Sequence, residues 1–344
     1  MLKNIHFETP KEWQKITTID MHTGGEPLRI PINGLPELKG NSVLEVRRYF
    51  RDNHDKIRTG LMWEPRGHAD MYGAIITRPF SENADFGTFF LHNEGYSTMC
   101  GHAIIALTKF AIETGLVKEL GNEPELIIDA PPGLIRAKAH MENGKVVRTS
   151  FLNVPSFLYL RDQRVDVSGL GKVNFDIAYG GAFYAFVNVE PLGLKMDASD
   201  YNRLIDYGRR IKHAVMDNFQ IKHPFEEDLS FLYGTIFTGK PENPKNHSRN
   251  VCIFADGEVD RSSTGSGVSA RAALHFAKGE LKMGETITIE SILGTTMTVK
   301  VHEETTYGLH KAIVPEVSGT ASFVGKNEFW FDPEDGLKDG FIFR

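Results

Sequence analysis

Two stretches of the chain place their apolar residues at helical spacing. Apolar side chains recur at intervals of three and four from residue 101 to the glycine at 115, and again from residue 268 to the glycine at 279. Apolar residues cover much of the circumference of both stretches. We therefore predict two buried helices, each ended by its glycine.

Most of the other apolar segments are short and typical of strands. They are rich in β-branched and aromatic residues, and the chain's 33 glycines supply turns between such segments. The clearest runs are residues 126–128, 184–189, 235–237, 251–254 and 286–289. This mixture predicts an α+β fold with curved, mostly antiparallel sheets, each wrapped around a central helix.

The chain also repeats itself in a consistent order. IDMHTGG at residues 19–25 resembles FDIAYGG at 175–181, and the Cys-Gly that opens the first helix corresponds to the Thr-Gly at 264–265. LIID at 126–129 corresponds to ITIE at 287–290. So long a period indicates two homologous domains related by a pseudo-twofold axis, and not a solenoid.

The repeat suggests where these domains begin and end. We predict a first domain over residues 1–170, a second over 171–324, and a return of residues 325–344 to the first. The active site is expected between the two domains.

Composition excludes several classes of protein. The chain has 344 residues, of which 41% are apolar, and a net charge of −6, so it shows no electrostatic footprint for nucleic acid or an anionic membrane. No apolar run approaches the roughly 18 residues of a membrane span, and the first twenty residues lack a signal-peptide pattern. Two cysteines are too few for a disulfide scaffold or a Cys₄ zinc site. We expect a cytoplasmic protein and leave its oligomeric state open, a homodimer included.

The candidate chemistry lies at the starts of the two predicted helices. Cys100 precedes Gly101, and Thr264 stands at the equivalent position before Gly265 and Ser266. Unpaired N–H groups at a helix start bind anions, and glycine lets a ligand approach the backbone. Two such starts could share one carboxylate. The same field can lower the pKa of a cysteine, so Cys100 is a candidate base.

Simpler interpretations exist for each of these residues. Cys100 could be a small buried side chain, His102 a core histidine and Asp260 a solvated loop acid. GSG at 265–267 is only a fragment of a phosphate-binding loop, and the acidic and histidine residues at 64–70 lack metal-ligand spacing. The positions of these residues in the duplicated frame favour the functional interpretation.

Four motifs together resemble the proline racemase family. EGYSTMCGH at 94–102 is similar to its first active-site motif, and DRSSTGSG at 260–267 is similar to its second. MHTGGEP at 21–27 and EPRGHADM at 64–71 are further similarities. The resemblance extends from about residue 18 to about residue 325. It implies the diaminopimelate-epimerase-like fold, a small-molecule substrate, and neither a cofactor nor a metal.

The resemblance also implies roles for individual residues. In the racemases and epimerases of this family, two cysteines face opposite sides of the substrate α-carbon, and Cys100 matches the first. Asp260 and the His102 side chain match the groups that hold the ring nitrogen. The backbone N–H groups that match the carboxylate cradle belong to Gly101, His102, Gly265 and Ser266.

The second motif departs from the racemase pattern, which reads DRSPCGTG. Ser263, Thr264 and Ser266 differ, and Thr264 replaces the second catalytic cysteine. A hydroxyl without a base beside it cannot exchange an α-proton as a thiol can. Cysteine paired with threonine resembles the trans-3-hydroxy-L-proline dehydratases of this family. The implied reaction is a cofactor-independent syn elimination of water that gives Δ1-pyrroline-2-carboxylate.

Two other functions stay open at this point. One is a proline racemase or 4-hydroxyproline 2-epimerase, in which Thr264 would have to act as the second base. The other is a non-catalytic binder of a cyclic amino acid.

Overall fold

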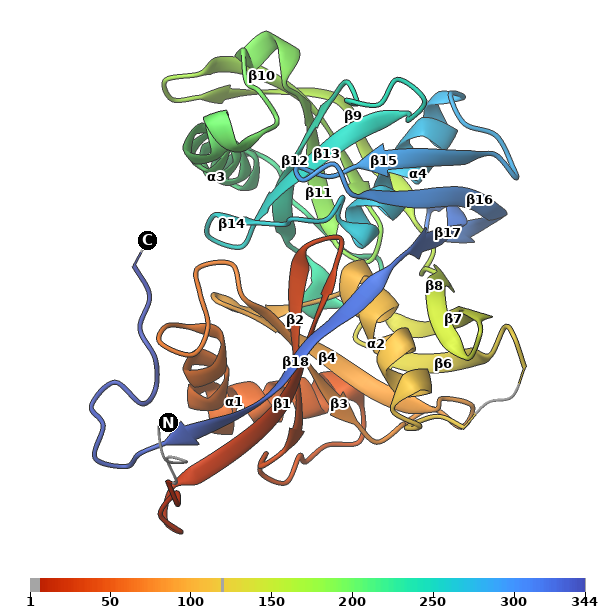
Figure 1. The fold of residues 1–344 in the computed structure, drawn as a ribbon. Coiled ribbons are helices and arrows are strands. Elements are labelled where there is room, and N and C mark those ends of the chain that lie inside the picture. The colour runs from red at the N-terminus through yellow and green to blue at the C-terminus, as the bar shows by residue number, and fades with distance from the viewer. Residues whose placement is uncertain (1–6, 119–120, 344) are drawn as a thin grey trace.

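A computed structural model describes residues 7–118 and 121–343 as two lobes, shown one above the other in Figure 1. The first-half elements are β1 (Gln14–Thr23), β2 (Glu26–Asn33), α1 (Val43–Met62), β3 (Tyr72–Thr77), β4 (Phe86–His92), β5 (Gly95–Ser97), α2 (Gly101–Glu113), β6 (Glu125–Ala130), β7 (Gly133–Glu142) and β8 (Lys145–Leu152). Those that follow are β9 (Phe157–Val167), β10 (Gly171–Tyr179), β11 (Phe183–Asn188), η1 (Glu190–Leu192), η2 (Ala198–Asp200), α3 (Tyr201–Asn218), η3 (Glu227–Leu229), β12 (Leu232–Gly239), β13 (Ser248–Phe254), β14 (Glu258–Val259), α4 (Gly265–Lys278), β15 (Thr286–Glu290), β16 (Thr296–Tyr307), β17 (His310–Gly319) and β18 (Ala321–Phe331).

Strand pairing repeats between the two halves of the chain. In the first half, β2 pairs with β3 and β4 with β6 in parallel, whereas the other neighbours are antiparallel. In the second half, the equivalent pairs β11–β12 and β13–β15 are again parallel among antiparallel neighbours. Antiparallel pairing of β8 with β17 joins the lobes. The predicted α+β fold with two related, mostly antiparallel halves is confirmed.

Two long strands flank the repeat and bear on the domain boundary. β9 pairs along β10, from Val167 opposite Gly171 to Phe157 opposite Tyr179. The last long strand, β18, crosses back and pairs with β1 over its whole length (Figure 1). We therefore propose that the second domain begins before β9, near residue 155, instead of at residue 171. The pairing of β18 supports the proposed return of the C-terminal segment to the first domain.

The two predicted central helices are present and buried. α2 packs against β1, β7 and β8, and α4 packs against β9, β10, β16 and β17. Gly115 and Gly279 follow these helices with φ of 73° and 76°, the left-handed conformation that glycine adopts without strain. Among the described residues, no helix combines the length and apolarity that crossing a membrane requires.

Each half also contains a second helix that the sequence analysis does not predict. α1 packs on β3 and β4, and α3 packs on β12 and β13, so each covers a sheet face opposite the central helix. These helices are mostly polar. In α3 the buried residues form one narrow stripe: Leu204, Gly208, Ile211 and Val215. A stripe this narrow is a weak apolar signal, although its spacing is helical.

Candidate active site

The first turns of α2 and α4 meet between the lobes. A Cβ atom built on Gly101 would lie 2.5 Å from the Cα of Gly265, so only glycine permits this approach. The first N–H groups of an α-helix have no partner within the helix, and they carry partial positive charge. Two such helix starts therefore concentrate hydrogen-bond donors at one point.

One small cavity lies beside this contact and collects every site residue predicted from the sequence. It has a volume of about 10 Å³, room for roughly one water molecule. A larger ligand can enter only if the lobes separate or side chains move. The cavity is lined by Tyr72, Met99, Cys100, Gly101, His102, Tyr184, Tyr233, Phe254, Asp260, Thr264, Gly265 and Ser266.

Cys100 caps the N-terminus of α2. Its sulfur accepts a hydrogen bond from the N–H of Ala103 at 3.4 Å and lies 3.1 Å from Nδ1 of His102. Burial raises the pKa of the Cys100 thiol well above its ordinary value, although the hydroxyl of Tyr72 and the N–H of Ala103 act in the opposite direction. This direction differs from that expected at a helix start, because the thiol is only 4% exposed and burial is the largest effect.

His102 provides Cys100 with a neighbouring base. Burial lowers the pKa of the imidazole, while the charge of Asp260 raises it less strongly, so the neutral form is favoured. The ring edge packs on Tyr72, with 4.7 Å between ring centroids. The family resemblance implies a role for His102 only at the substrate nitrogen, and the contact of its ring with Cys100 is not predicted from the sequence.

Asp260 reaches the cavity from the loop between β14 and α4. Its Oδ1 accepts a hydrogen bond from the N–H of Ser262 at 2.8 Å, and its own N–H donates to the carbonyl of Cys252. The side chain is buried, at 4% exposure, and it lines the cavity. The simpler interpretation, a solvated surface acid, is therefore wrong.

Thr264 occupies the position equivalent to Cys100 but has a different geometry. Its φ is 67°, rare for a β-branched residue, whereas φ of Cys100 is −139°. The Thr264 side chain does not cap α4, and its Oγ1 is buried without a hydrogen-bond partner in the described part of the chain. The hydroxyl is thus available to a ligand.

Aromatic side chains form a wall that the sequence analysis does not predict. Tyr233 stacks on Phe254 with 5.4 Å between ring centroids, and the hydroxyl of Tyr184 hydrogen-bonds Oγ of Ser266 at 2.7 Å. Tyr184 and Phe254 lie within runs recognised only as strands. Alternation along a strand could have suggested which of their side chains share a face, but not that one face borders a cavity.

The cavity therefore combines two helix starts, one thiol, one imidazole and one carboxylate beside an aromatic wall. Such a set suits a small ring that carries a carboxylate and a basic nitrogen. Within residues 7–118 and 121–343, no group of three or more histidine, cysteine, aspartate or glutamate side chains is arranged to hold a metal ion.

Comparison with known proteins agrees with this chemistry. A trans-3-hydroxy-L-proline dehydratase from Colwellia psychrerythraea is 52% identical over the full length of both chains. A 3-hydroxyproline 2-epimerase from Burkholderia multivorans is 44% identical over 96% of this chain and 99% of its own. The crystal structure of a hydroxyproline epimerase from Agrobacterium vitis with bound trans-4-OH-L-proline is similar with a TM-score of 0.89, at 27% identity and 96% coverage of each chain. A model of the proline racemase family matches residues 18–342, and the chain belongs to this family.

Proposed function

We propose that this protein is a trans-3-hydroxy-L-proline dehydratase, a hydro-lyase that needs no cofactor. The observation that carries the proposal is the asymmetry of the cavity, where Cys100 of α2 is matched by Thr264 and not by a second thiol. Inversion at the α-carbon needs a base on each side of the ring, whereas elimination needs one. The dehydratase relative, 52% identical over the whole chain, supports the same choice.

Substrate binding follows from the donors and acceptors around the cavity. The N–H groups at the starts of α2 and α4 would hold the carboxylate and stabilise the negative charge that develops as the α-proton leaves. Asp260 would pair with the ring ammonium. The ring would pack against the aromatic side chains of Tyr72, Tyr233 and Phe254.

The reaction would begin with a proton transfer between neighbouring side chains. The thiol proton of Cys100 would pass to Nδ1 of His102, 3.1 Å away. Because burial raises the pKa of the thiol and lowers that of the imidazole, the ammonium of the bound substrate would have to supply the positive charge that stabilises the thiolate. The thiolate then removes the α-hydrogen of the substrate and becomes a thiol again.

The same thiol would complete the elimination. In trans-3-hydroxy-L-proline the 3-hydroxyl lies on the ring face of the α-hydrogen, so Cys100 can protonate it as the C–O bond breaks. Water leaves and the thiolate returns. The enamine product then tautomerises to Δ1-pyrroline-2-carboxylate. Thr264 would contribute a hydroxyl donor and no base.

Epimerisation is the second candidate, because the relative from Burkholderia multivorans is named a 3-hydroxyproline 2-epimerase. Incubation with trans-3-hydroxy-L-proline in D₂O distinguishes the candidates. A dehydratase gives the cyclic imine, an epimerase returns the inverted amino acid deuterated at the α-carbon, and a non-catalytic binder leaves the substrate unchanged. Only the first result agrees with our proposal.

A further inference from the structure

The two residues on either side of Asp260 are fastened to the opposite lobe. Asp260 belongs to the second half of the chain, between β14 and α4. The N–H of Arg261 donates to Oε2 of Glu26 at 2.7 Å, and the N–H of Val259 donates to Oδ1 of Asp70 at 3.0 Å. Glu26 begins β2 and Asp70 precedes β3, so both acceptors come from the first lobe.

Asp70 makes further contacts across the same interface. Its Oδ2 accepts a hydrogen bond from the guanidinium of Arg261 at 2.7 Å and another from the hydroxyl of Tyr201 at 3.1 Å. The Arg261 guanidinium also donates to the carbonyl of Val259 at 2.8 Å. The backbone around Asp260 is thus held by a closed set of bonds that crosses between the lobes.

Glu26 is completely buried, and its second oxygen, Oε1, has no hydrogen-bond partner in the described part of the chain. Burial raises the pKa of Glu26 well above its ordinary value, and the nearby charge of Asp260 raises it further. Burial therefore disfavours the charged form of the carboxyl group that accepts the Arg261 N–H.

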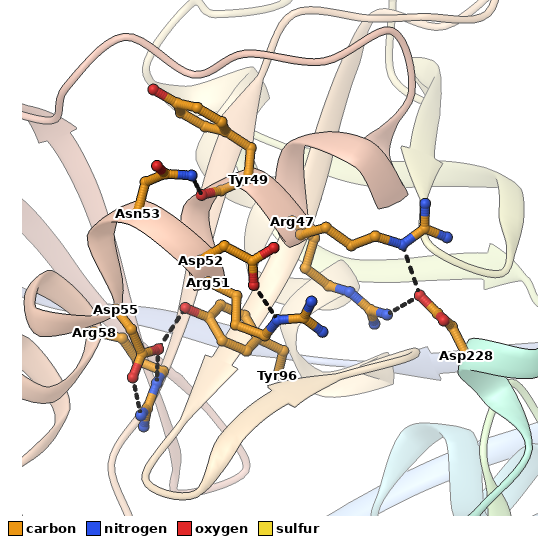
Figure 2. A network of polar contacts seen from close by, with 10 residues as sticks. Arg47, Tyr49, Arg51, Asp52, Asn53, Asp55, Arg58, Tyr96 and Asp228 are labelled. Carbon is orange, nitrogen blue, oxygen red and sulfur yellow. Dashed lines mark hydrogen bonds and ion pairs between the residues drawn. The ribbon is translucent and has the colours of Figure 1, made fainter.

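A second contact between the lobes lies away from this loop. Arg47 and Arg48 of α1 pair with Asp228 of η3 at 3.4 and 3.0 Å, and Figure 2 shows Arg47 and Asp228 meeting there. Asp228 makes none of the contacts that hold Val259 or Arg261. It therefore provides a control for the effect of weakening the lobe interface in general.

We propose that Glu26 and Asp70 are positioning residues, which set the Asp260 carboxylate against the substrate nitrogen when the lobes close. The inference rests on the proposed function, in which Asp260 pairs with the ring ammonium. Closure would then do two things at once: it would enclose the substrate, and it would bring the ammonium partner into place. In the open protein, the Asp260 loop would lack its fixed orientation.

Two ligands distinguish a role in positioning Asp260 from a role only in holding the two lobes together. L-Proline carries the carboxylate and the ammonium but has no 3-hydroxyl to eliminate. (S)-Tetrahydrofuran-2-carboxylate carries the same carboxylate with a ring oxygen in place of the nitrogen. Their affinities, measured by calorimetry, report on the Asp260 contact without turnover. If the wild type fails to dehydrate trans-3-hydroxy-L-proline, only the proposed function is contradicted. The comparison of the two ligands still tests the positioning role of Glu26 and Asp70.

We expect Glu26→Leu and Asp70→Asn each to weaken L-proline binding about tenfold or more and to change binding of the oxygen analogue less than about twofold. Glu26→Leu removes the acceptor of the Arg261 N–H, and Asp70→Asn removes the charged partner of the Arg261 guanidinium. Glu26→Gln keeps an acceptor for Arg261 and should bind L-proline within about threefold of wild type. In an Asp260→Ala background, Glu26→Leu should cause no further loss, because coupled residues are not additive.

Other results overturn the inference. One is a wild type that does not prefer L-proline to the oxygen analogue. Another is an equal loss of both ligands in Glu26→Leu and Asp70→Asn. A third is the same selective loss of L-proline in Asp228→Asn, which should weaken closure without disturbing the Asp260 loop. If Glu26→Leu fails to fold, Asp70→Asn alone decides the matter.

Discussion

Gly101 and Gly265 face each other at the centre of the molecule, where each occupies the space that a side chain on the other would need. A Cβ on Gly101 would lie 2.5 Å from the Cα of Gly265, and a Cβ on Gly265 would lie 2.7 Å from the Cα of Gly101. Both neighbours are backbone atoms, which cannot turn aside as a flexible side chain could.

Gly101→Ala should therefore separate the two helix starts and disrupt the proposed carboxylate cradle. We expect kcat/KM for dehydration to fall about 10²-fold, because a misplacement of about 1 Å costs that much at a reacting centre. Gly325→Ala is the matched control, since a Cβ there meets no atom within 4 Å. Equal activity in the two variants would show that the contact between the helices does not matter for catalysis.

Cys100→Ser should abolish dehydration and leave the fold intact. A serine hydroxyl at this position ionises far less readily than a thiol, and general acid–base groups contribute about 10²–10⁴-fold. Circular dichroism and turnover should be measured together. Cys252, the other cysteine, does not line the cavity, and Cys252→Ala should lose far less activity than Cys100→Ser. Retention of more than about a tenth of wild-type turnover by Cys100→Ser would remove Cys100 from the mechanism.

Asp260→Asn should lower kcat/KM because the substrate ammonium would lose its charged partner in a closed site. Truncating one member of a buried charge pair costs about 2–5 kcal/mol, which corresponds to a loss of at least about 30-fold. Steady-state kinetics with trans-3-hydroxy-L-proline check this. Unchanged kcat/KM would mean that another group binds the nitrogen.

Thr264→Cys should introduce a second thiol opposite Cys100. We expect the variant to gain weak epimerase activity toward proline or 4-hydroxyproline, while the wild type shows none. The gain should be small, because the left-handed backbone at this residue, with φ of 67°, directs its side chain differently from that of Cys100. Chiral chromatography of the recovered amino acid measures inversion. Inversion by the wild type as fast as dehydration would contradict the proposed one-base mechanism.

His223 should make stability depend on pH below neutrality. Burial lowers its pKa to about 4, and Nδ1 accepts hydrogen bonds from the N–H groups of Phe225 and Glu226. The folded protein keeps the ring neutral, while the unfolded chain binds a proton below about pH 6.5. Stability should therefore fall from about pH 6.5 toward pH 4. The Tm of His223→Gln should decrease less between pH 6.5 and pH 4 than the Tm of His213→Gln, a control variant in which an exposed histidine is replaced.

The sequence predicts the fold best where the same motif occurs in both halves of the chain. The glycine turns after β1 and β10 and the helix starts at Gly101 and Gly265 recur in order, so each half supports the assignment of the other. The outer helices α1 and α3 are mostly polar, which weakens the helical signal of their buried residues. These helices are stabilised by packing on sheet faces, and the strands that form those faces lie outside the helices' own stretches of sequence.

The candidate site is predicted less completely. Cys100 and Thr264 can be identified because they stand beside glycines at helix starts, and Asp260 because it opens the motif that resembles the family's second active-site motif. The raised pKa of the Cys100 thiol depends on its burial in the folded protein, which no local pattern contains. Glu26 and Asp70 lie within recognised motifs, yet their partners, Arg261 and Val259, are about 190–235 residues away in the chain.

The pairing of β18 with β1 has a consequence for synthesis on the ribosome. Gln14 of β1 pairs with Phe331 of β18, so one edge of β1 has no partner strand until nearly the whole chain has been made. The strands of the second lobe, from β9 to β17, are contiguous in sequence and can assemble sooner. An exposed strand edge is a template for aggregation. A nascent chain that stops before residue 321 should therefore be a better chaperone substrate than the full-length protein, although its catalytic motifs are complete.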